Sequence, residues 1–325
     1  MLPTAGAFPF SQSISENSID VSNDCIAAFV GAPSEILPKT YSNPSDSIFD
    51  GRWELGATSY SGSFCDVTIA KPAERDVPFS YAVKMLRPQW RQSQVALAVL
   101  RREAEIGQLV SHSHLVPVLD DRTNAKTPYL IQPWLNGKTL RYFLSKERCP
   151  NLRETIWMIR QAAEALAELE KYDFCHADVK PENIMISSVG HLTLLDLGFA
   201  RRFRESVTPI DHFVGGTPRY MPPEVLGKSA IIDSRSDIYS LGCVMGEMLF
   251  GEQFFVNESK TKILSELFRR FLTKEKILWN VRLQHFIRQT ESLLTSMLAT
   301  SPENRPQSTP QLVRELVILE LFLIE

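Results

Sequence analysis

Short apolar runs separated by turn residues characterise the chain after Arg52, and helical spacing replaces them after Gly137. The runs at 64–70 and 79–85 are typical of β-strands and are separated by a proline-containing turn, which predicts a β-hairpin. Further elements expected from the pattern are a helix over residues 94–110 and strands over 115–119 and 129–131.

The later part of the chain is expected to be mainly helical. Apolar residues there recur at spacings of three and four, which places them on one helical face. They are Ile156, Ile159, Ala163 and Leu166. Strands followed by helices favour an α+β fold in two lobes. We expect a β-rich N-lobe with one helix over 51–135 and a larger, mainly helical C-lobe over 136–325.

Residues 1–50 differ from the rest in composition. They are rich in Ser, Pro and Asn and contain one basic and six acidic residues. Such a composition predicts a flexible or surface-draped segment. Its apolar patch at 25–30 either docks on the folded body or is simply a few apolar residues in a tail.

The charge balance limits the classes of partner. The 325 residues include 35 basic and 38 acidic ones, for a formal net charge of -3. The first 50 residues account for -5, which leaves 34 basic and 32 acidic residues, or +2, for the remainder. A near-neutral chain argues against broad electrostatic binding to nucleic acid or to anionic membrane.

Cysteine usage and hydropathy indicate a cytoplasmic protein. The five cysteines are scattered and form no CxxC pair, so we expect a reduced compartment with neither a zinc site nor a disulfide framework. The first basic residue is Lys39, which argues against a secretory signal. The longest apolar stretch, 316–324, contains Glu320 and is shorter than the roughly 20 residues that a membrane-spanning helix needs.

Two polar motifs after residue 175 carry the clearest chemical signal. Asp178 and Asn183 place a carboxylate and an amide five residues apart, and Asp196 follows 13 residues after Asn183. Apolar runs at 184–186 and 192–195 predict a short hairpin that brings the two motifs together. Carboxylate and amide oxygens suit Mg²⁺, so Asn183 and Asp196 are candidate metal ligands. Asp178 is then available to orient or deprotonate a hydroxyl group.

The order of these motifs resembles that of the eukaryotic-type serine/threonine protein kinases, over roughly residues 52–325. Residues 81–84, Tyr-Ala-Val-Lys, are similar to the family's lysine strand, which implies that Lys84 binds the α- and β-phosphates of ATP. The resemblance implies Glu103 as the partner of Lys84, with Glu105 as the alternative. It also implies that Asp178 accepts the proton of the hydroxyl and that Lys180 neutralises charge on the γ-phosphate.

The same resemblance implies a site for ATP. The residues implied to contact the nucleotide are Gly62, Val67, Ala82, Lys84, Gln132, Pro133, Leu135 and Met185. Gln132 would be the gatekeeper, the residue just before the hinge, and the backbone of the next positions would bond the adenine. Pro133 has no N–H, but the family uses a carbonyl at that position, so a proline is tolerated there.

Further segments are similar to the family's structural motifs. Residues 216–224 look like the end of the activation segment, which implies a peptide-binding role. Residues 236–242 resemble the helix that braces the catalytic loop through Asp237. By the same resemblance Glu224 pairs with Arg305.

The sequence departs from the family pattern in the phosphate loop. Counting along the chain puts Tyr60, Gly62 and Cys65 at the three glycine positions, so only Gly62 is retained, and the other two side chains are expected to obstruct the phosphates. Gly56 would serve as a first glycine only with a loop insertion.

Two other departures concern activation. Ala177 replaces the arginine that binds an activation-loop phosphate in the family, which implies activity without that phosphorylation. Gly107 replaces a packing leucine in the helix, so we expect the helix to be loosened and its position to depend on a regulatory protein partner or on the N-terminal segment.

These features predict an ATP- and Mg²⁺-dependent kinase that phosphorylates Ser or Thr of protein substrates, without a membrane span and without a nucleic-acid partner. Alanine at both Ser206 and Thr208 is expected to leave activity nearly intact. The alternative is a pseudokinase that acts as a nucleotide-binding or scaffolding module. Phosphotransfer to a small molecule is a third interpretation, which the peptide-binding resemblance disfavours.

Overall fold

The computed structural model describes residues 47–146, 150–203, 218–226, 232–251 and 281–324, with short pieces at 254, 264–265 and 268–269. These residues belong to two compact units. The first comprises the chain up to Tyr142 together with Glu182–Gly198, and the second comprises Phe143–Pro181 together with the chain from Phe199 onward. The apolar patch at 25–30 lies outside the described residues.

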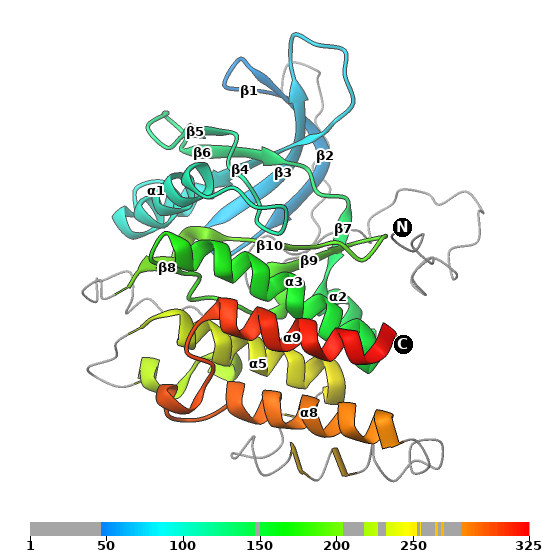
Figure 1. The fold of residues 1–325 in the computed structure, drawn as a ribbon. Helices are drawn as coiled ribbons and strands as arrows, with labels where there is room; N and C mark the ends of the chain where they lie inside the picture. The colour runs from blue at the N-terminus through cyan, green and yellow to red at the C-terminus, as the bar shows by residue number, and fades with distance from the viewer. Residues whose placement is uncertain are drawn as a thin grey trace, which may run out of the picture. The chain divides into compact units, whose positions relative to one another are not determined.

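An antiparallel six-stranded sheet forms most of the first unit (Figure 1). Its strands lie side by side in the order β1-β2-β3-β4-β6-β5. Their bounds are β1 (Ile48–Phe49), β2 (Trp53–Ser61), β3 (Cys65–Pro72), β4 (Tyr81–Leu86), β5 (Asp120–Arg122) and β6 (Tyr129–Pro133). The predicted hairpin is confirmed, because β3 and β4 pair along their length.

The strand predicted over 115–119 was wrong. Leu115 makes only an isolated bridge to Leu194, and the N–H of Leu119 donates to the carbonyl of Ile131 at 2.7 Å. The segment is extended but is bound at single points, and the sheet strand begins only at Asp120. Leu115, Val116 and Val118 are buried and Leu119 is exposed, so the apolar character of the segment reflects mainly burial rather than membership of the sheet.

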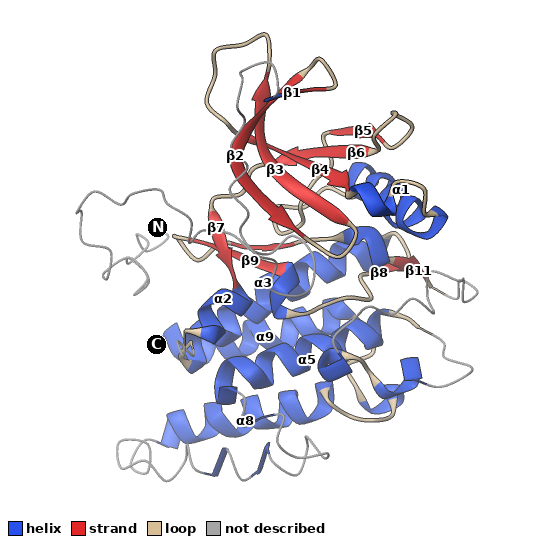
Figure 2. Cartoon of the chain, turned by 180° about the vertical axis from the view of Figure 1, so that it is seen from behind, coloured by secondary structure: helices blue, strands red, loops and turns tan. Residues whose placement is uncertain are grey.

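The predicted helix over 94–110 is confirmed as α1 (Gln94–Leu109). It begins where the side chain of Ser93 accepts a hydrogen bond from the N–H of Ala96, an N-cap that satisfies one of the helix's free donors. Helix α1 packs against β4 and β6 (Figure 2). Its buried face includes one charged residue, Glu103.

Gly107 is a close-packing position in α1. A Cβ atom built there would lie 2.6 Å from Cγ2 of Val118, and the carbonyl of Gly107 accepts a hydrogen bond from the N–H of Val118 at 3.0 Å. Gly107 therefore leaves no packing gap against Val118, and the loosening expected for this helix stays a prediction. Glycine is needed here because Val118 fills the space that a larger side chain would take.

Strand register separates the side chains of the sheet onto two faces. Tyr60 pairs with Val67, Val67 with Lys84, and Ala82 with Gln132. Directly paired residues of antiparallel strands point to the same side of a sheet. The opposite face carries a separate buried cluster of Leu55, Ala70, Val83, Met85, Tyr129 and Ile131.

A second, three-stranded sheet completes the first unit. It consists of β7 (Gly137–Thr139), β9 (Ile184–Ser187) and β10 (Leu192–Leu194), in the order β10-β9-β7. The predicted hairpin over 184–195 is confirmed by the antiparallel pairing of β9 with β10. The short helix α2 (Leu140–Ser145) begins directly after β7.

The second unit is built on helices, so the predicted α+β class is confirmed. They are α3 (Leu152–Lys171), α5 (Ser234–Phe250), α8 (Val281–Met297) and α9 (Thr309–Ile324). Helix α3 packs against α5 and α9, and its buried residues include the four apolar residues of the predicted helical face. Asn151 and Glu154 cap its start reciprocally, each side chain accepting from the other's backbone N–H. A two-stranded sheet pairs β8 (Phe174–Cys175) with β11 (Arg201–Arg202).

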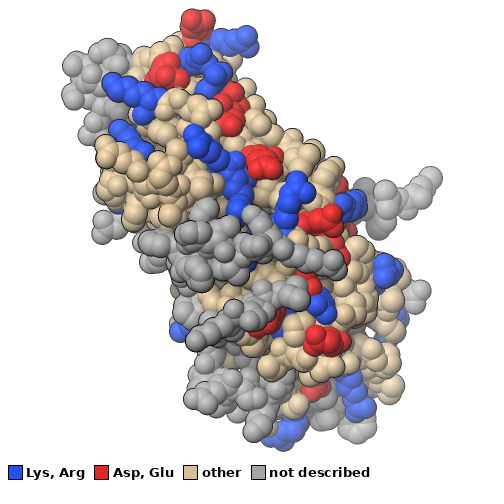
Figure 3. Space-filling view, turned by 90° about the vertical axis from the view of Figure 1, so that its left-hand side faces the viewer, with Lys and Arg blue, Asp and Glu red and all other residues tan. Residues whose placement is uncertain are grey.

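Single turns of 3₁₀ helix connect several of these elements. They cover Pro88–Trp90, Pro181–Asn183, Leu197–Phe199, Pro218–Tyr220, Pro223–Leu226 and Pro302–Asn304. Where the face shown in Figure 3 is formed by described residues, basic and acidic side chains are interspersed, as expected for a nearly neutral chain.

Candidate functional site

A buried lysine between two carboxylates forms the charged centre of the first unit. Nζ of Lys84 lies 2.6 Å from Oε2 of Glu103 and 3.3 Å from Oδ1 of Asp196. The side chains of all three residues are at most 3% exposed. Burial alone would lower the pKa of Lys84, but the charges of Asp196 and Glu103 outweigh it and raise that pKa. The lysine is therefore a permanent cation aligned by two acceptors.

Local structure decides which glutamate pairs with Lys84. Glu103 lies on the buried face of α1, whereas Glu105, two residues later, is exposed. Residues two apart on a helix point in different directions, so one helix cannot present both to the same lysine. The structure thus pairs Lys84 with Glu103 and not with the alternative.

A glutamine holds the second oxygen of the same carboxylate. Nε2 of Gln132 donates to Oε1 of Glu103 at 3.0 Å. Glu103 therefore accepts from Lys84 on one oxygen and from Gln132 on the other. Sequence reasoning placed Gln132 beside the nucleotide but missed this contact, because it joins β6 to α1 across 29 residues of sequence.

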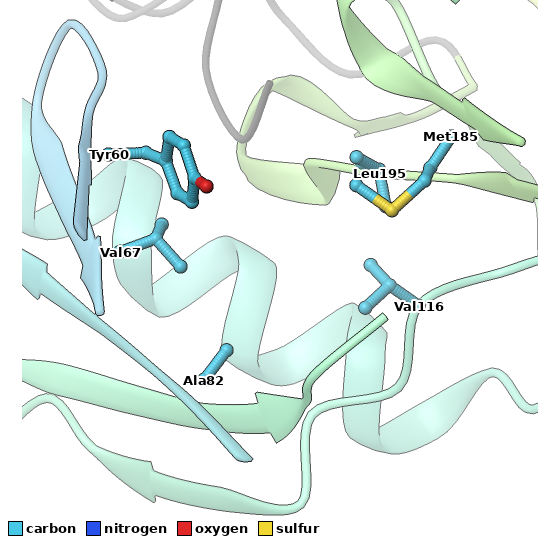
Figure 4. Packing of buried hydrophobic residues seen from close by; sticks show 6 residues of the cluster. All are labelled: Tyr60, Val67, Ala82, Val116, Met185 and Leu195. Carbon is cyan, nitrogen blue, oxygen red and sulfur yellow. The ribbon is translucent and has the colours of Figure 1, made fainter. Parts of the chain in front are cut away.

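The side chains expected to sandwich a base come together in one apolar cluster, which we call the Tyr60 cluster. Its buried members are Tyr60, Val67, Ala82, Val116, Met185 and Leu195, with Trp134 and Leu135 packed against it. Figure 4 shows the six buried side chains, which come from the strands, from the segment between α1 and β5 (Val116) and from the segment after β10 (Leu195). Three of them, Val67, Ala82 and Met185, were predicted from the sequence to sandwich the base. Tyr60 was assigned to the phosphate loop, and Val116 and Leu195 were missed as site residues.

The structure places the ring of Tyr60 among the residues expected to sandwich the base. The count along the sequence placed Tyr60 at a phosphate-loop glycine, but its ring lies in the Tyr60 cluster and stacks on Trp134, with 6.2 Å between ring centroids. The register of β2 against β3 shifts between Leu55 and Ser59, so β2 contains extra residues there that have no partner on β3, as in a β-bulge. Tyr60 thereby becomes the partner of Val67 and lies among the side chains expected to sandwich the base.

The loop between β2 and β3 is a tight turn. The N–H of Gly62 donates to the carbonyl of Cys65 at 2.7 Å, so only Ser63 and Phe64 lie between them. Arg87 donates from Nη1 to the carbonyl of Gly62 at 3.0 Å. The N–H of Gly62 is therefore used within the turn.

Cys65 is buried at the start of β3. Burial raises the pKa of its thiol far above the ordinary value, although Lys84 opposes this. The thiol is therefore protonated and unreactive at neutral pH. Cys65 lies two residues before Val67 on β3, so its side chain points to the face of the sheet that carries Lys84. The obstruction of the phosphates by Cys65 stays a prediction.

Asn183 and Asp196 stand at the two ends of the β9–β10 hairpin in the first unit. The N–H of Leu195 donates to the carbonyl of Asn183 at 2.9 Å, which ties the two ends together, and both polar side chains are buried. Their amide and carboxylate oxygens fit Mg²⁺. Among the described residues, no group of three or more His, Cys, Asp or Glu is placed to hold a metal ion. Asn183 and Asp196 would therefore hold Mg²⁺ together with phosphate oxygens and water.

In the second unit, Asp178 and Lys180 lie on a loop that is held by Asp237. Nζ of Lys180 is 2.8 Å from Oδ2 of Asp178. The carboxylate of Asp237 accepts from the N–H groups of His176 at 2.6 Å and Ala177 at 2.9 Å. Ala177 has a φ of 61°, a left-handed conformation that a non-glycine residue rarely adopts. The two hydrogen bonds to Asp237 stabilise that conformation.

The carboxylate of Asp237 is buried, which disfavours its charged form. Burial raises its pKa from the ordinary 3.8 to about 6, although His176 and the two backbone N–H groups oppose the rise. The loop that carries Asp178 is thus anchored by a group that titrates near neutral pH.

The second unit also contains the predicted pairing of Glu224 with Arg305. Nη1 of Arg305 lies 2.7 Å from Oε1 of Glu224, and Nη2 lies 2.8 Å from Oε2. This bidentate geometry is the strongest form of ion pair between side chains. The preceding residues, including Ser206, Thr208 and 216–217, lie outside the described residues.

Comparison with known proteins identifies the family. The model of the family described as "Protein kinase domain" matches residues 57–317. Serine/threonine-protein kinase PknB of Mycobacterium tuberculosis is 30% identical over 279 residues, which cover 83% of this chain and 43% of the relative. PknB of Mycobacterium leprae is 30% identical over 273 residues, with 82% and 42% covered. A probable serine/threonine-protein kinase PknB of Corynebacterium glutamicum is 34% identical over 219 residues, with 65% and 33% covered.

The chain spans less than half the length of these curated relatives. Within the described residues, no helix is both long and apolar enough to span a membrane.

Proposed function

This chain belongs to the serine/threonine protein kinase family, and from that premise we propose that it transfers the γ-phosphoryl group of ATP to serine or threonine hydroxyls of protein substrates. The observation that carries the proposal is the buried contact of Lys84 with Glu103 and Asp196. A lysine held in this way is a fixed cation for phosphate oxygens, and it is costly to keep buried without such a role.

The first unit supplies the nucleotide side of the reaction. Lys84 neutralises the α- and β-phosphates, and Asn183 and Asp196 hold Mg²⁺, which supplies further charge neutralisation when bound. The base packs against Val67, Ala82 and Met185, and the carbonyl of Pro133 and the backbone of Leu135 bond its edge. In the tight turn, Gly62 contributes a close backbone approach but not its N–H, which Cys65 already accepts.

The second unit supplies the groups that act on the acceptor hydroxyl. Asp178 orients the hydroxyl and accepts its proton, and Lys180, 2.8 Å from Asp178, neutralises charge on the transferred group. Asp237 keeps their loop in place through two backbone hydrogen bonds. Because Ala177 has no side chain that could pair with a phosphate, activity does not require activation-loop phosphorylation.

Radiolabelled ATP tests the proposal directly. Wild type should incorporate phosphate into a protein acceptor, and Asp178→Ala should lower incorporation by at least a hundredfold, since proton transfer alone contributes about 10²–10⁴-fold. Glu103→Gln should also be strongly impaired, whereas the matched control Glu105→Gln, on the exposed face of the same helix, should match wild type. Equal incorporation by wild type and Asp178→Ala would remove the enzyme interpretation.

A pseudokinase is the second candidate, and one observation favours it. The ring of Tyr60 is buried in the Tyr60 cluster, where the base is expected to bind. A chain that binds nucleotide without transferring phosphate would show ATP binding by calorimetry and no incorporation in the radiolabel assay. A regulatory partner that positions α1 was proposed partly because Gly107 lacks a packing side chain. Gly107 is tightly packed against Val118, so this argument for a partner no longer holds. The cytoplasmic location stays a prediction from the sequence.

A further inference from the structure

Gln132 is a fully buried polar residue on the base side of the sheet. It is 0% exposed and pairs directly with Ala82, a member of the Tyr60 cluster. Lys84 lies two residues beyond Ala82 on β4 and therefore points to the same side. The side chain of Gln132 is thus on the face that carries both the apolar cluster and the buried lysine.

The orientation of its amide follows from the chemistry of its partner. Oε1 of Glu103 can only accept when ionised, so the group that lies 3.0 Å away must be the NH₂ of Gln132. The other oxygen of Glu103 accepts from Lys84 at 2.6 Å. The amide is therefore locked by a buried ion pair, with its carbonyl oxygen directed away from Glu103.

That carbonyl oxygen has no hydrogen-bond donor among the described residues, although it is completely buried. An unsatisfied buried acceptor costs about 1–3 kcal/mol. An apolar side chain of similar size at residue 132 would avoid this cost. The presence of this acceptor beside the predicted base site is explained if the bound nucleotide supplies the missing hydrogen-bond donor.

We propose that Oε1 of Gln132 accepts a hydrogen bond from the exocyclic amino group of adenine, so that one side chain both selects the base and holds Glu103 against Lys84. Adenine carries an NH₂ donor at C6, whereas guanine carries a carbonyl oxygen that would face Oε1 as a second acceptor. Gln132 is therefore a specificity-determining residue for adenine nucleotides and a positioning residue for Lys84. This proposal rests on the proposed function in one respect, namely that the nucleotide bound at the site is ATP.

Binding of two nucleotides to two proteins tests the base contact. The nucleotides are ATP and purine riboside 5′-triphosphate, which lacks only the 6-amino group, and the variant is Gln132→Met, which keeps the length of the side chain without its polar atoms. Affinities are measured by calorimetry in the presence of Mg²⁺. Wild type should prefer ATP, and Gln132→Met should reduce that preference about tenfold, as expected for an unsatisfied buried acceptor. Leu130→Met, two residues earlier on the same strand, is the control and should keep the wild-type preference.

The positioning role has its own readout. Loss of the Gln132 donor to Glu103 should lower kcat several-fold with both nucleotides equally, while the loss of affinity is confined to ATP. If Gln132 had only a packing role, Gln132→Met would keep the wild-type preference for ATP, and kcat and affinity would not respond differently to the two nucleotides. An unchanged preference in Gln132→Met overturns the base contact. If Gln132→Met does not fold, wild type decides: equal affinities for the two nucleotides overturn the base contact, and a clear preference for ATP supports it.

The outcomes also separate this inference from the proposed function. Nucleotide preference that depends on Gln132 without any phosphate transfer would support the inference and remove the kinase activity. Phosphate transfer with an unchanged preference would do the opposite.

Discussion

Replacing Arg305 should destabilise the second unit strongly, because all of its hydrogen-bonding capacity is used inside the protein. Its guanidinium has five N–H donors. Two go to the carboxylate of Glu224, and three go to backbone carbonyls: that of Ala299 at 2.8 Å from Nε, that of Arg235 at 2.9 Å from Nη1 and that of Thr300 at 3.1 Å from Nη2. The side chain of Arg305 is 0% exposed, and that of Glu224 is 14% exposed.

The size of the effect follows from these contacts. Removing one partner of a buried ion pair costs about 3–5 kcal/mol, because the other charge stays buried and unpaired. Arg305→Met should therefore remove a large part of a total stability of about 5–15 kcal/mol. At about 2–4 °C per kcal/mol for a domain of this size, the melting temperature should fall by roughly 6–20 °C. Arg305→Lys, which keeps the charge but only three donors, should fall in between.

Thermal and urea unfolding followed by circular dichroism measure the loss. The matched control is Arg235→Met, because Arg235 also pairs with a carboxylate, Asp233, but is about one quarter exposed. Such a partly exposed pair contributes about 0–1 kcal/mol. If Arg305→Met lost no more stability than Arg235→Met, burial and the five hydrogen bonds of Arg305 would not explain its contribution to stability, and the reasoning would be refuted.

Three further predictions test other contacts. Gly107→Ala should lower the free energy of unfolding by about 1–3 kcal/mol through overpacking against Val118, and a neutral result by urea titration would show that the helix shifts freely. Tyr60→Ala should tighten ATP binding roughly tenfold, since displacing a buried aromatic ring costs about 1.5–3 kcal/mol, and weaker binding by calorimetry would show instead that the ring supports the base. Because the folded pKa of Asp237 is raised from 3.8 to about 6, its stabilising effect is complete below pH 3.8 and is lost as the pH rises through about 6. Wild type should therefore lose about 2–3 kcal/mol relative to Asp237→Asn between about pH 4 and pH 7, and parallel stability curves for the two proteins would contradict this.

Local patterns correctly predicted helix α1, the apolar face of α3 and the strands β3, β4, β6, β9 and β10, but not the nine-residue strand β2. Helix α1 begins after Ser93 and α3 after Asn151 because the caps and the apolar spacing act within a few residues of each other. The chemistry was also readable, since the order of Lys84, Asp178 and Asp196 follows from the chain itself. Their roles stay proposals until the assays above are done.

The segment 115–119 shows where local patterns fail. It has the composition of a strand, yet only single hydrogen bonds connect it to its neighbours. Burial and sheet pairing both select apolar, β-branched residues, so composition alone does not separate them.

The sequence by itself determined which chemical groups this protein carries and in what order, because motifs and helix caps are read over short distances along the chain. Only the tertiary structure decided which way Tyr60 points, why residue 107 is a glycine and that Gln132 bonds Glu103. Tyr60 depends on strand register, because the shift between Leu55 and Ser59 pairs it with Val67, whereas the register before the shift would pair it with Cys65. The other two depend on contacts between separate elements, Val118 against α1 and β6 against α1, whose distances exist only once the chain has folded.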